Sequence, residues 1–416
     1  MNRPRWANDK LALVLFALAH VGIFAGLFRS VYNIPYSGTG LFYDYAGKVL
    51  SGLMPYRDFV LEYPPFALVF FTLPRILGES FRWYYVWFQT QVVVFDLLTL
   101  GTLYVAARWW SLSVWRLLGV YTVVVLAVGP ITLHQYDIFP ATFSVLAIVW
   151  FARGRDVGAW VFLALGLMTK VYPILLAPVF IILDWRANRR RFARAAIAFA
   201  STCIVVLLPW LVTAPTSLRV LVNYHTKRGI HLDSTYGTLA FIAQGLGLGL
   251  VDVRMSFASW NLAGRVPDAL ATVSTFVLAL TLIVVYAIIA RRAKDREMDV
   301  GCDVEFVAHS SALVLVASMA ASKVLSPQYL IWAMVMIPLV TRPYRLAVWI
   351  LFTGIGVLTY YMYPHHYDEL LATRTAALVG MGLRNALLIV LAVVLAIALR
   401  RARATEGAPH PLPAMA

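Results

Sequence analysis

Long apolar runs separated by short polar segments dominate the chain. Twelve runs are long enough, alone or packed against neighbours, to span a membrane, since a spanning helix needs about 20 apolar residues. We predict helices at residues 11–28, 83–107, 117–133, 138–152, 157–170, 172–184, 195–212, 267–290, 306–322, 327–341, 346–362 and 375–399. The pattern predicts an all-α integral membrane protein, a polytopic bundle of about 12 transmembrane helices.

Three segments depart from the simple pattern. The runs 157–170 and 172–184 are too short for two ordinary spans, so we expect a hairpin broken at TKVYP (169–173) and shielded by neighbouring helices. The first run lacks a small-residue cleavage site, which favours a retained anchor over a signal peptide. Residues 66–77 are expected to form an interfacial helix in the headgroup layer.

Composition and charge agree with this prediction. The chain is 61% hydrophobic and only 13% charged, whereas soluble domains carry about 25% charged residues. The net charge of +15 does not indicate nucleic-acid binding, because the basic residues lie mainly in short gaps between apolar runs. Seven segments assigned to the cytoplasmic side hold 21 of the 35 Lys and Arg. The positive-inside rule then places both termini inside.

The chain is expected to form one transmembrane domain, residues 1–400, followed by a disordered cytoplasmic tail at 401–416. No soluble domain or internal repeat is evident. The two cysteines are far apart in sequence, so neither a disulfide nor a metal site is expected. An arginine-rich, lysine-poor composition favours a bacterium with GC-rich DNA, hence its inner or plasma membrane.

Polar and ionisable residues gather on the non-cytoplasmic side of this topology. That side has long loops at about 29–82 and 213–266, and shorter turns at 134–137, 322–329 and 363–369. Ionisable groups at helix ends on one membrane face indicate a functional site there. The alternative is that these segments are ordinary solvated loops.

Several familiar chemistries lack their sequence signatures. The chain has no GxxxxGK[ST] nucleotide loop, no HExxH, no paired cysteines and no GxSxG motif. What remains is a set of carboxylates in one loop and cations in others. A carboxylate can act as general base on a hydroxyl, and Lys or Arg can stabilise a leaving phosphate. Together they suit transfer of a group from a lipid-linked phosphate at the membrane surface.

Five separate stretches resemble one known family. They are YAGKVLSGLMPYRDFVLEYPP (45–65), HQYDIFPATFSVLAI (134–148), ALGLMTKVYPILLAPV (164–179), NYHTKRGIHLDS (223–234) and SKVLSPQYLIW (322–332). Together they resemble glycosyltransferase family 87 of the GT-C fold class, which includes mycobacterial mannosyltransferases that build phosphatidylinositol mannosides. The resemblance implies a polyprenyl-phosphate-sugar donor, with mannose as the sugar, and a glycolipid or glycan acceptor. One departure is Gly40, where many relatives carry an acidic residue.

The first outer loop is expected to supply the catalytic base. Asp58 and Asp44 are the first candidates, followed by Glu62. Prolines in PYRDFVLEYPP (55–65) stiffen this loop. The alternatives are a local ion pair among Arg57, Asp58 and Glu62, and a turn or cap role for Asp44.

Cations on other loops are expected to bind the donor phosphate. Lys323 and Arg228 are favoured, with Lys170 and Lys227 behind them. The alternative is that these side chains extend to the interface or to water. Expected sugar or acceptor contacts are His134, Gln135, Asp137, Tyr172, His225, His231, Gln328, Tyr329 and His366.

The resulting hypothesis is a single displacement. An acceptor hydroxyl, deprotonated by the base, attacks the anomeric carbon with inversion and displaces the lipid phosphate. No cofactor and no metal are required, although a carboxylate-bound Mg²⁺ stays an alternative. Two other classes stay open, a transporter or flippase of lipid-linked sugars and a non-catalytic scaffold. A transporter would keep its ionisable groups near the bilayer midplane instead of at one face.

Overall fold

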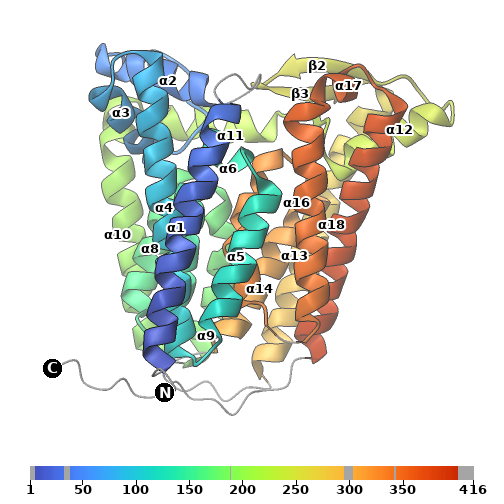
Figure 1. Cartoon of the computed structure of the whole chain (residues 1–416). Coiled ribbons are helices and arrows are strands. Elements are labelled where there is room, and N and C mark those ends of the chain that lie inside the picture. The colour runs from blue at the N-terminus through green and yellow to red at the C-terminus, as the bar shows by residue number, and fades with distance from the viewer. Residues whose placement is uncertain (1–4, 32–37, 188, 295–302, 342, 402–416) are drawn as a thin grey trace.

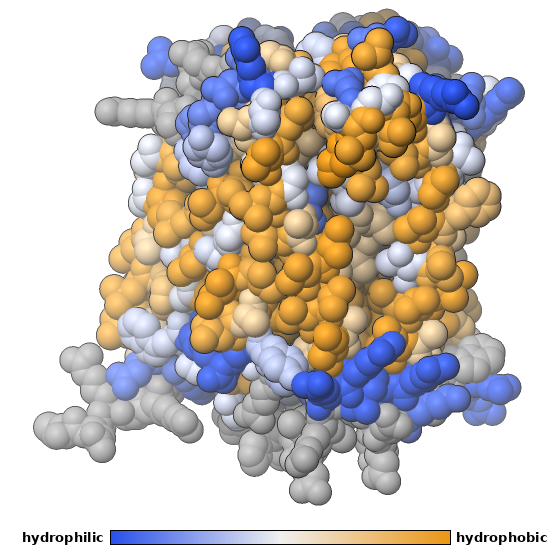
Figure 2. Space-filling view, turned by 90° about the vertical axis from the view of Figure 1, so that its right-hand side faces the viewer, coloured by the Kyte–Doolittle hydropathy of each residue, from blue (hydrophilic) through white to orange (hydrophobic). Residues whose placement is uncertain are grey.

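Long apolar helices form the body of the molecule. The computed structural model describes residues 5–31, 38–187, 189–294, 303–341 and 343–401. Within these ranges seven helices are long and apolar enough to cross a membrane. They are α1 (Arg5–Val31), α4 (Phe81–Trp109), α10 (Arg189–Thr213), α13 (Arg265–Lys294), α14 (Val304–Ala321), α16 (Arg345–Tyr360) with its continuation to His365, and α18 (Thr375–Arg401). Figure 1 shows a bundle in which α1 begins and α18 ends at the same end. In Figure 2 an apolar belt lies between two polar bands.

Shorter helices complete the bundle. They are α5 (Val114–Val128), α7 (Ile138–Ala152), α8 (Asp156–Thr169), the 3₁₀ turn η1 (Tyr172–Leu176) and α9 (Ala177–Ala187). The predicted all-α polytopic architecture is confirmed, and helical structure lies in each of the twelve predicted segments. The predicted break is present as well, because Lys170 has an extended backbone between α8 and η1.

The predicted span 327–341 is not one regular helix. It divides into the 3₁₀ turn η2 (Pro327–Tyr329), the short helix α15 (Leu330–Met334) and the 3₁₀ turn η3 (Ile337–Leu339). Two prolines, Pro327 and Pro338, stand at the starts of the 3₁₀ turns and remove backbone donors. The segment from Leu330 to Val340 is buried among α5, α7 and α14. Irregular backbone is tolerated at membrane depth where protein covers it in this way.

One end of the bundle carries the short elements and is called the site end; the opposite end, where α1 begins, is the terminus end (Figure 1). The short helices are α2 (Thr39–Leu50), α3 (Ala67–Leu77), α6 (Ile131–His134), α11 (Ser217–Thr226), α12 (Thr235–Gly245), α17 (Tyr367–Leu371) and the π-helical turn η4 (Tyr361–His365). The helix expected at 66–77 is therefore present as α3. Its place in the headgroup layer stays a prediction.

A small antiparallel sheet also lies at the site end, and the all-α prediction did not include it. The strands β1 (Ile230–His231), β2 (Asp252–Ser256) and β3 (Ser259–Ala263) are ordered β1-β3-β2. The β2–β3 turn has positive φ at Phe257 and Ala258. Such two-residue turns usually show Asn-Gly or Asp-Gly, and this one has neither, so the sequence carried no hairpin signal.

A buried polar cluster holds α1 to its neighbours. His20 Nδ1 lies 2.6 Å from Asp96 Oδ2 on α4, and its Nε2 lies 2.9 Å from Thr122 Oγ1 on α5. Tyr121 donates to the second oxygen of Asp96 at 2.7 Å. His20, Asp96 and Tyr121 are fully buried. Polar groups in an apolar bundle are stable only when paired in this manner.

Replacing His20 with leucine should therefore destabilise the fold. The variant leaves the Asp96 carboxylate without its basic partner, and we expect the free energy of unfolding to fall by about 3 kcal/mol. Thermal unfolding in detergent, followed by tryptophan fluorescence, measures the effect. The matched control is His20→Leu/Asp96→Leu, which should recover most of the loss. A single variant as stable as the wild type would show that the pair contributes nothing.

Candidate active site

A cavity of about 620 Å³ opens at the site end. Chain segments far apart in sequence line it, namely the first loop, the α6–α7 and α8–η1 junctions, the 224–231 segment, the β2–β3 turn and the 322–332 segment. Nine of the sixteen predicted site residues lie in its wall. They are Glu62, Gln135, Lys170, Tyr172, Arg228, His231, Lys323, Gln328 and Tyr329.

Glu62 is the one acidic residue among the described residues that line the cavity. It follows the buried Leu61, and its own side chain is only 6% exposed. Tyr45, on α2, donates a hydrogen bond of 2.5 Å to Glu62 Oε2. Burial raises the pKa of Glu62, and the hydrogen bond from Tyr45 and the charge of Arg228 only partly oppose this. A carboxylate with a raised pKa is a stronger base than an ordinary glutamate.

Asp58 and Asp44 do not line the cavity. Asp58 accepts two hydrogen bonds from Arg57, at 2.8 and 2.9 Å, and one from the backbone N–H of Met54. These contacts lower the pKa of Asp58 to about 2, which makes it a weak base. Asp44 pairs with Lys48 at 2.7 Å on the exposed face of α2. Asp58 therefore forms an ion pair with Arg57, as its alternative proposed, but without Glu62. Asp44 lies within α2 and is neither a turn nor a cap residue.

Two cations stand close together on the wall. Arg228 follows α11, and its Nη2 donates to Ser259 Oγ at 2.7 Å, next to the β2–β3 turn. Lys323 follows α14, and its Nζ donates to the carbonyl of Thr226 at 3.1 Å. Burial and the positive charge of Arg228 both lower the pKa of Lys323. Two like charges held near each other at a cavity are relieved by an anion, so this part of the wall suits a phosphate.

Lys170 is already paired with an acidic residue. Its Nζ lies 2.6 Å from Asp137 Oδ1, which also accepts a 2.6 Å hydrogen bond from Trp332 Nε1. The ammonium lies 4.5 Å from the ring centre of Tyr136 and 5.6 Å from that of Tyr329. Asp137 is fully buried and does not line the cavity, whereas its partner Lys170 does.

The remaining predicted residues lie elsewhere. His134 is buried and outside the wall, and its carbonyl accepts a hydrogen bond from Thr39. Lys227 is exposed at the end of α11. His366 Nδ1 lies 3.1 Å from Glu369 at the start of α17. The side chain of His225 is outside the described part of the chain.

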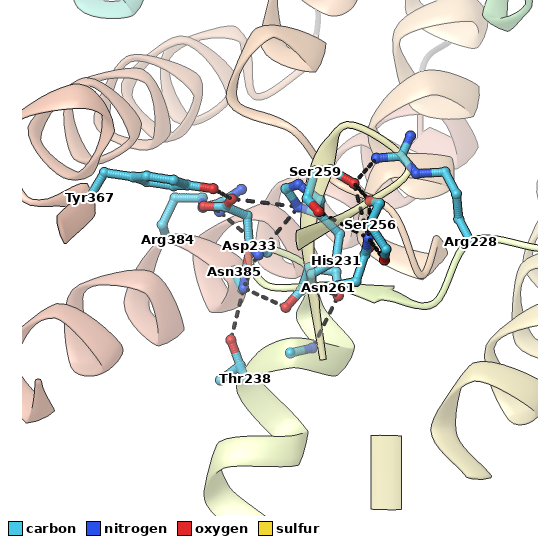
Figure 3. Close-up of polar contacts among 12 residues, drawn as sticks. Arg228, His231, Asp233, Thr238, Ser256, Ser259, Asn261, Tyr367, Arg384 and Asn385 are labelled. Carbon is cyan, nitrogen blue, oxygen red and sulfur yellow. Dashed lines mark hydrogen bonds and ion pairs between the residues drawn. The ribbon is translucent and has the colours of Figure 1, made fainter. Parts of the chain in front are cut away.

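A polar network behind His231 was missed by the sequence analysis (Figure 3). The His231 backbone N–H donates to the carbonyl of Lys323 at 2.9 Å, so β1 holds the loop that carries this cation. Tyr367, also in the wall, donates to Asp233 Oδ2 at 3.2 Å. Arg384 of α18 donates to the Asp233 carbonyl at 2.9 Å, and its Nη2 lies 3.6 Å from Asp233 Oδ1.

Asn385 extends the same anchor. Its Nδ2 donates to the carbonyls of Asp233 and Ser234 and to Thr238 Oγ1. Helix α18 thus holds the 233–238 turn through a pair of adjacent polar residues. The available signal was an arginine next to an asparagine within the apolar run 375–399, because an intramembrane charge marks a functional position.

The site contains no cluster that suggests a bound metal in the residues described. No group of three His, Cys, Asp or Glu side chains is placed to hold an ion within those ranges.

Comparison with known proteins assigns the chain to an enzyme class. The profile of glycosyltransferase family 87 matches residues 59–327, well over half of the chain. The chain therefore belongs to this family and is a multi-pass membrane glycosyltransferase. The match includes Glu62, Lys170, Arg228 and Lys323, whereas Asp44 and Asp58 precede it. Membership of an enzyme family argues against the two other classes, a transporter or flippase and a non-catalytic scaffold.

Among solved structures, ArnT from Cupriavidus metallidurans in the apo state is similar to this chain. The two are 13% identical with a TM-score of 0.49, and the alignment covers 93% of this chain and 76% of that chain. A comparison with curated proteins finds no match.

The Asp233 network generates a prediction about substrate binding. Arg384→Gln should loosen the turn that carries His231 and thereby displace Lys323. We expect the KM for the sugar donor to rise about tenfold with a smaller change in kcat, since small misplacements of binding groups are costly. Initial rates at varied donor concentration measure this.

Arg384→Lys is the matched variant, since it keeps the charge beside Asp233 and should restore part of the donor KM. Equal losses in kcat and stability with an unchanged KM would instead indicate a purely structural role for Arg384.

Proposed function

We propose that this enzyme transfers a sugar, mannose by family resemblance, from a polyprenyl-phosphate donor to a glycolipid or glycan acceptor. One observation carries the proposal. A single buried carboxylate, Glu62, faces the same cavity as Lys170, Arg228 and Lys323. The reaction needs both halves, a base for the acceptor hydroxyl and cations for the leaving lipid phosphate.

The donor phosphate binds beside Arg228 and Lys323 in this proposal. Both side chains reach the cavity from loops, and each carries hydrogen-bond donors suited to phosphate oxygens. Lys170 adds positive charge to the cavity wall. Its pairing with Asp137 makes a direct contact with the phosphate less favourable than for Arg228 and Lys323. Apolar residues of the bundle, among them Leu175, Leu278 and Met319, continue the wall and suit the first units of a prenyl chain.

Glu62 is the proposed general base, in preference to Asp58 and Asp44. It takes the proton of the acceptor hydroxyl as that oxygen attacks the anomeric carbon. The bond from this carbon to the lipid-phosphate oxygen breaks, and the phosphate leaves with the bonding electrons. Direct attack opposite the leaving group inverts the anomeric configuration. The proposed mechanism takes no proton or electron from a cofactor.

The distribution of basic residues between the two ends of the bundle indicates its orientation in the membrane. Arg and Lys residues of the described helix ends gather at the terminus end, for example Arg291, Arg292, Arg400 and Arg401. The positive-inside rule then places this end in the cytoplasm and the site end on the non-cytoplasmic side of a bacterial membrane. The proposed topology is that of a single GT-C domain over residues 1–400 with about twelve spans. The tail proposed from residue 401 onward lies, apart from Arg401, outside the described residues.

A transfer assay tests the assignment of the base. Radiolabelled polyprenyl-phosphate-mannose is offered with a panel of lipid and glycan acceptors to the enzyme in detergent. Glu62→Gln preserves the shape of the side chain and removes its basicity, so we expect turnover to fall by about 10²–10⁴-fold. Lys323→Ala should raise the donor KM.

Asp58→Asn and Asp44→Asn are the matched controls, because each neutralises a carboxylate outside the cavity. Both should keep turnover close to that of the wild type. Full turnover by Glu62→Gln together with loss in Asp58→Asn would overturn the assignment. If no acceptor or lipid-linked sugar supports transfer by the wild type, the proposed substrates are wrong.

The raised pKa of Glu62 predicts the acid limb of the pH profile. The base is active when deprotonated, so kcat/KM should fall as the pH drops through a value above the ordinary glutamate pKa of 4.5. Tyr45→Phe removes a hydrogen bond that stabilises the carboxylate, which raises the pKa of Glu62 further. The acid limb of this variant should therefore lie at higher pH. The pH dependence of initial rates measures the acid limb in the wild type and in the variant. An acid limb that does not shift in Tyr45→Phe would show that Glu62 is not the group that titrates.

A further inference from the structure

An uncharged segment at the site end remains outside the proposed mechanism. Between Asp233 and Asp252 the chain has no Asp, Glu, Lys, Arg or His. The segment contains α12 and the loop after it, in which Leu246, Leu248 and Leu250 alternate with glycine. These three residues, called the leucine tip, are 70%, 66% and 86% exposed. Exposed apolar side chains in such a group indicate an interaction surface.

The exposure follows from an ordered loop. Gly247 and Gly249 have φ of +74° and +156°, which side chains rarely permit and which turn the backbone sharply. The Gln244 side chain closes the loop by accepting a 2.6 Å hydrogen bond from the backbone N–H of Val251. The glycine turns thereby direct the leucines away from the protein. Leu239 and Ile242 on α12 are exposed as well, at 44% and 54%.

Contacts with α18 define how deep this segment lies. A Cβ on Gly382 would lie 3.4 Å from the Thr238 side chain, and Asn385 donates to Thr238 Oγ1 at 2.8 Å. Gly382 is seven residues, or about 10 Å, from the first residue of α18 at the site end. Helix α18 has 27 residues, about 40 Å, whereas the hydrocarbon core of a bilayer is about 30 Å thick. If α18 is centred in the bilayer, about 5 Å of it projects beyond the hydrocarbon core at each end, and Gly382 with the start of α12 beside it lies about 5 Å inside the boundary between headgroups and acyl chains.

Lipid-facing residues of α18 continue this surface. Val379 and Leu383 flank Gly382 and are 64% and 51% exposed, as expected for a helix that meets acyl chains. Because α12 packs beside this stretch, its exposed side chains extend the exposed apolar surface of a helix long enough to cross a membrane. The absence of charge removes the main cost of placing this helix against lipid.

We propose that α12 and the leucine tip insert into the bilayer leaflet at the site end, at the level where headgroups meet acyl chains. The occupant of this surface is lipid. Helix α12 continues directly from the 228–234 segment, which carries Arg228 and His231. Insertion of α12 therefore holds this wall of the cavity at a fixed height relative to the membrane. This inference concerns the fold in the membrane and does not depend on the identity of the sugar or acceptor.

Spin labels on single cysteines test the proposal in liposomes of phosphatidylcholine and phosphatidylglycerol. The background variant replaces Cys203 and Cys302 with serine. One label is placed at Leu248→Cys and, in separate proteins, at Leu246→Cys and Leu250→Cys. Collision with oxygen, which partitions into lipid, is compared with collision with a water-soluble nickel complex. We expect the oxygen-to-nickel ratio at the leucine tip to exceed the aqueous value and approach that of a lipid-facing position.

Two exposed positions calibrate the measurement. Leu280→Cys on α13 provides the lipid value, and Arg254→Cys on β2 provides the aqueous value, since both side chains are largely exposed. Ratios at the tip equal to that at Arg254→Cys would show a loop in water and overturn the proposal. Low collision with both reagents would show that protein covers the tip, as in a contact with a second copy, and would overturn it equally. Three label positions guard against one variant that folds poorly.

Discussion

Charged side chains at the edge of this apolar bundle must be paired, because an unpaired charge removed from water is costly. Most buried carboxylates of the described chain meet a basic partner, as Asp96 meets His20 and Asp137 meets Lys170. Glu62 is held instead by the Tyr45 hydroxyl, and it faces a cavity that Arg228 and Lys323 share. Such an arrangement is costly without a ligand. The proposed acceptor and donor phosphate would bind beside these charges.

The supporting structure explains how loops can hold such charges steady. The 228–234 segment is tied on one side to the Lys323 loop through β1 and on the other to α18 through Arg384 and Asn385. Helix α18 is long and spans the bundle, so it gives this turn a rigid support. Groups that bind or react with substrate need this kind of second layer, because loops alone position side chains poorly.

Membership of glycosyltransferase family 87 makes the chain an enzyme. The acidic and basic groups of its cavity come from different segments of the chain. The first loop carries the carboxylate, while segments after α11 and α14 carry the cations. Each group is anchored to a different part of the bundle. In the proposed mechanism, the donor lies along the helices and the acceptor reaches the cavity past the first loop.

Most helical segments, the break at TKVYP and the family could be predicted from the sequence alone. Apolar periodicity, proline positions and short motifs encode these features locally. The sequence could not choose among Asp44, Asp58 and Glu62, because that choice depends on distance. A tight turn directs Asp58 back to Arg57 and Met54, whereas four residues later the chain is buried and presents Glu62 to the cavity. Only tertiary packing brought Arg384 to Asp233 across some 150 residues, since pairing in a bundle follows helix contacts and not sequence order.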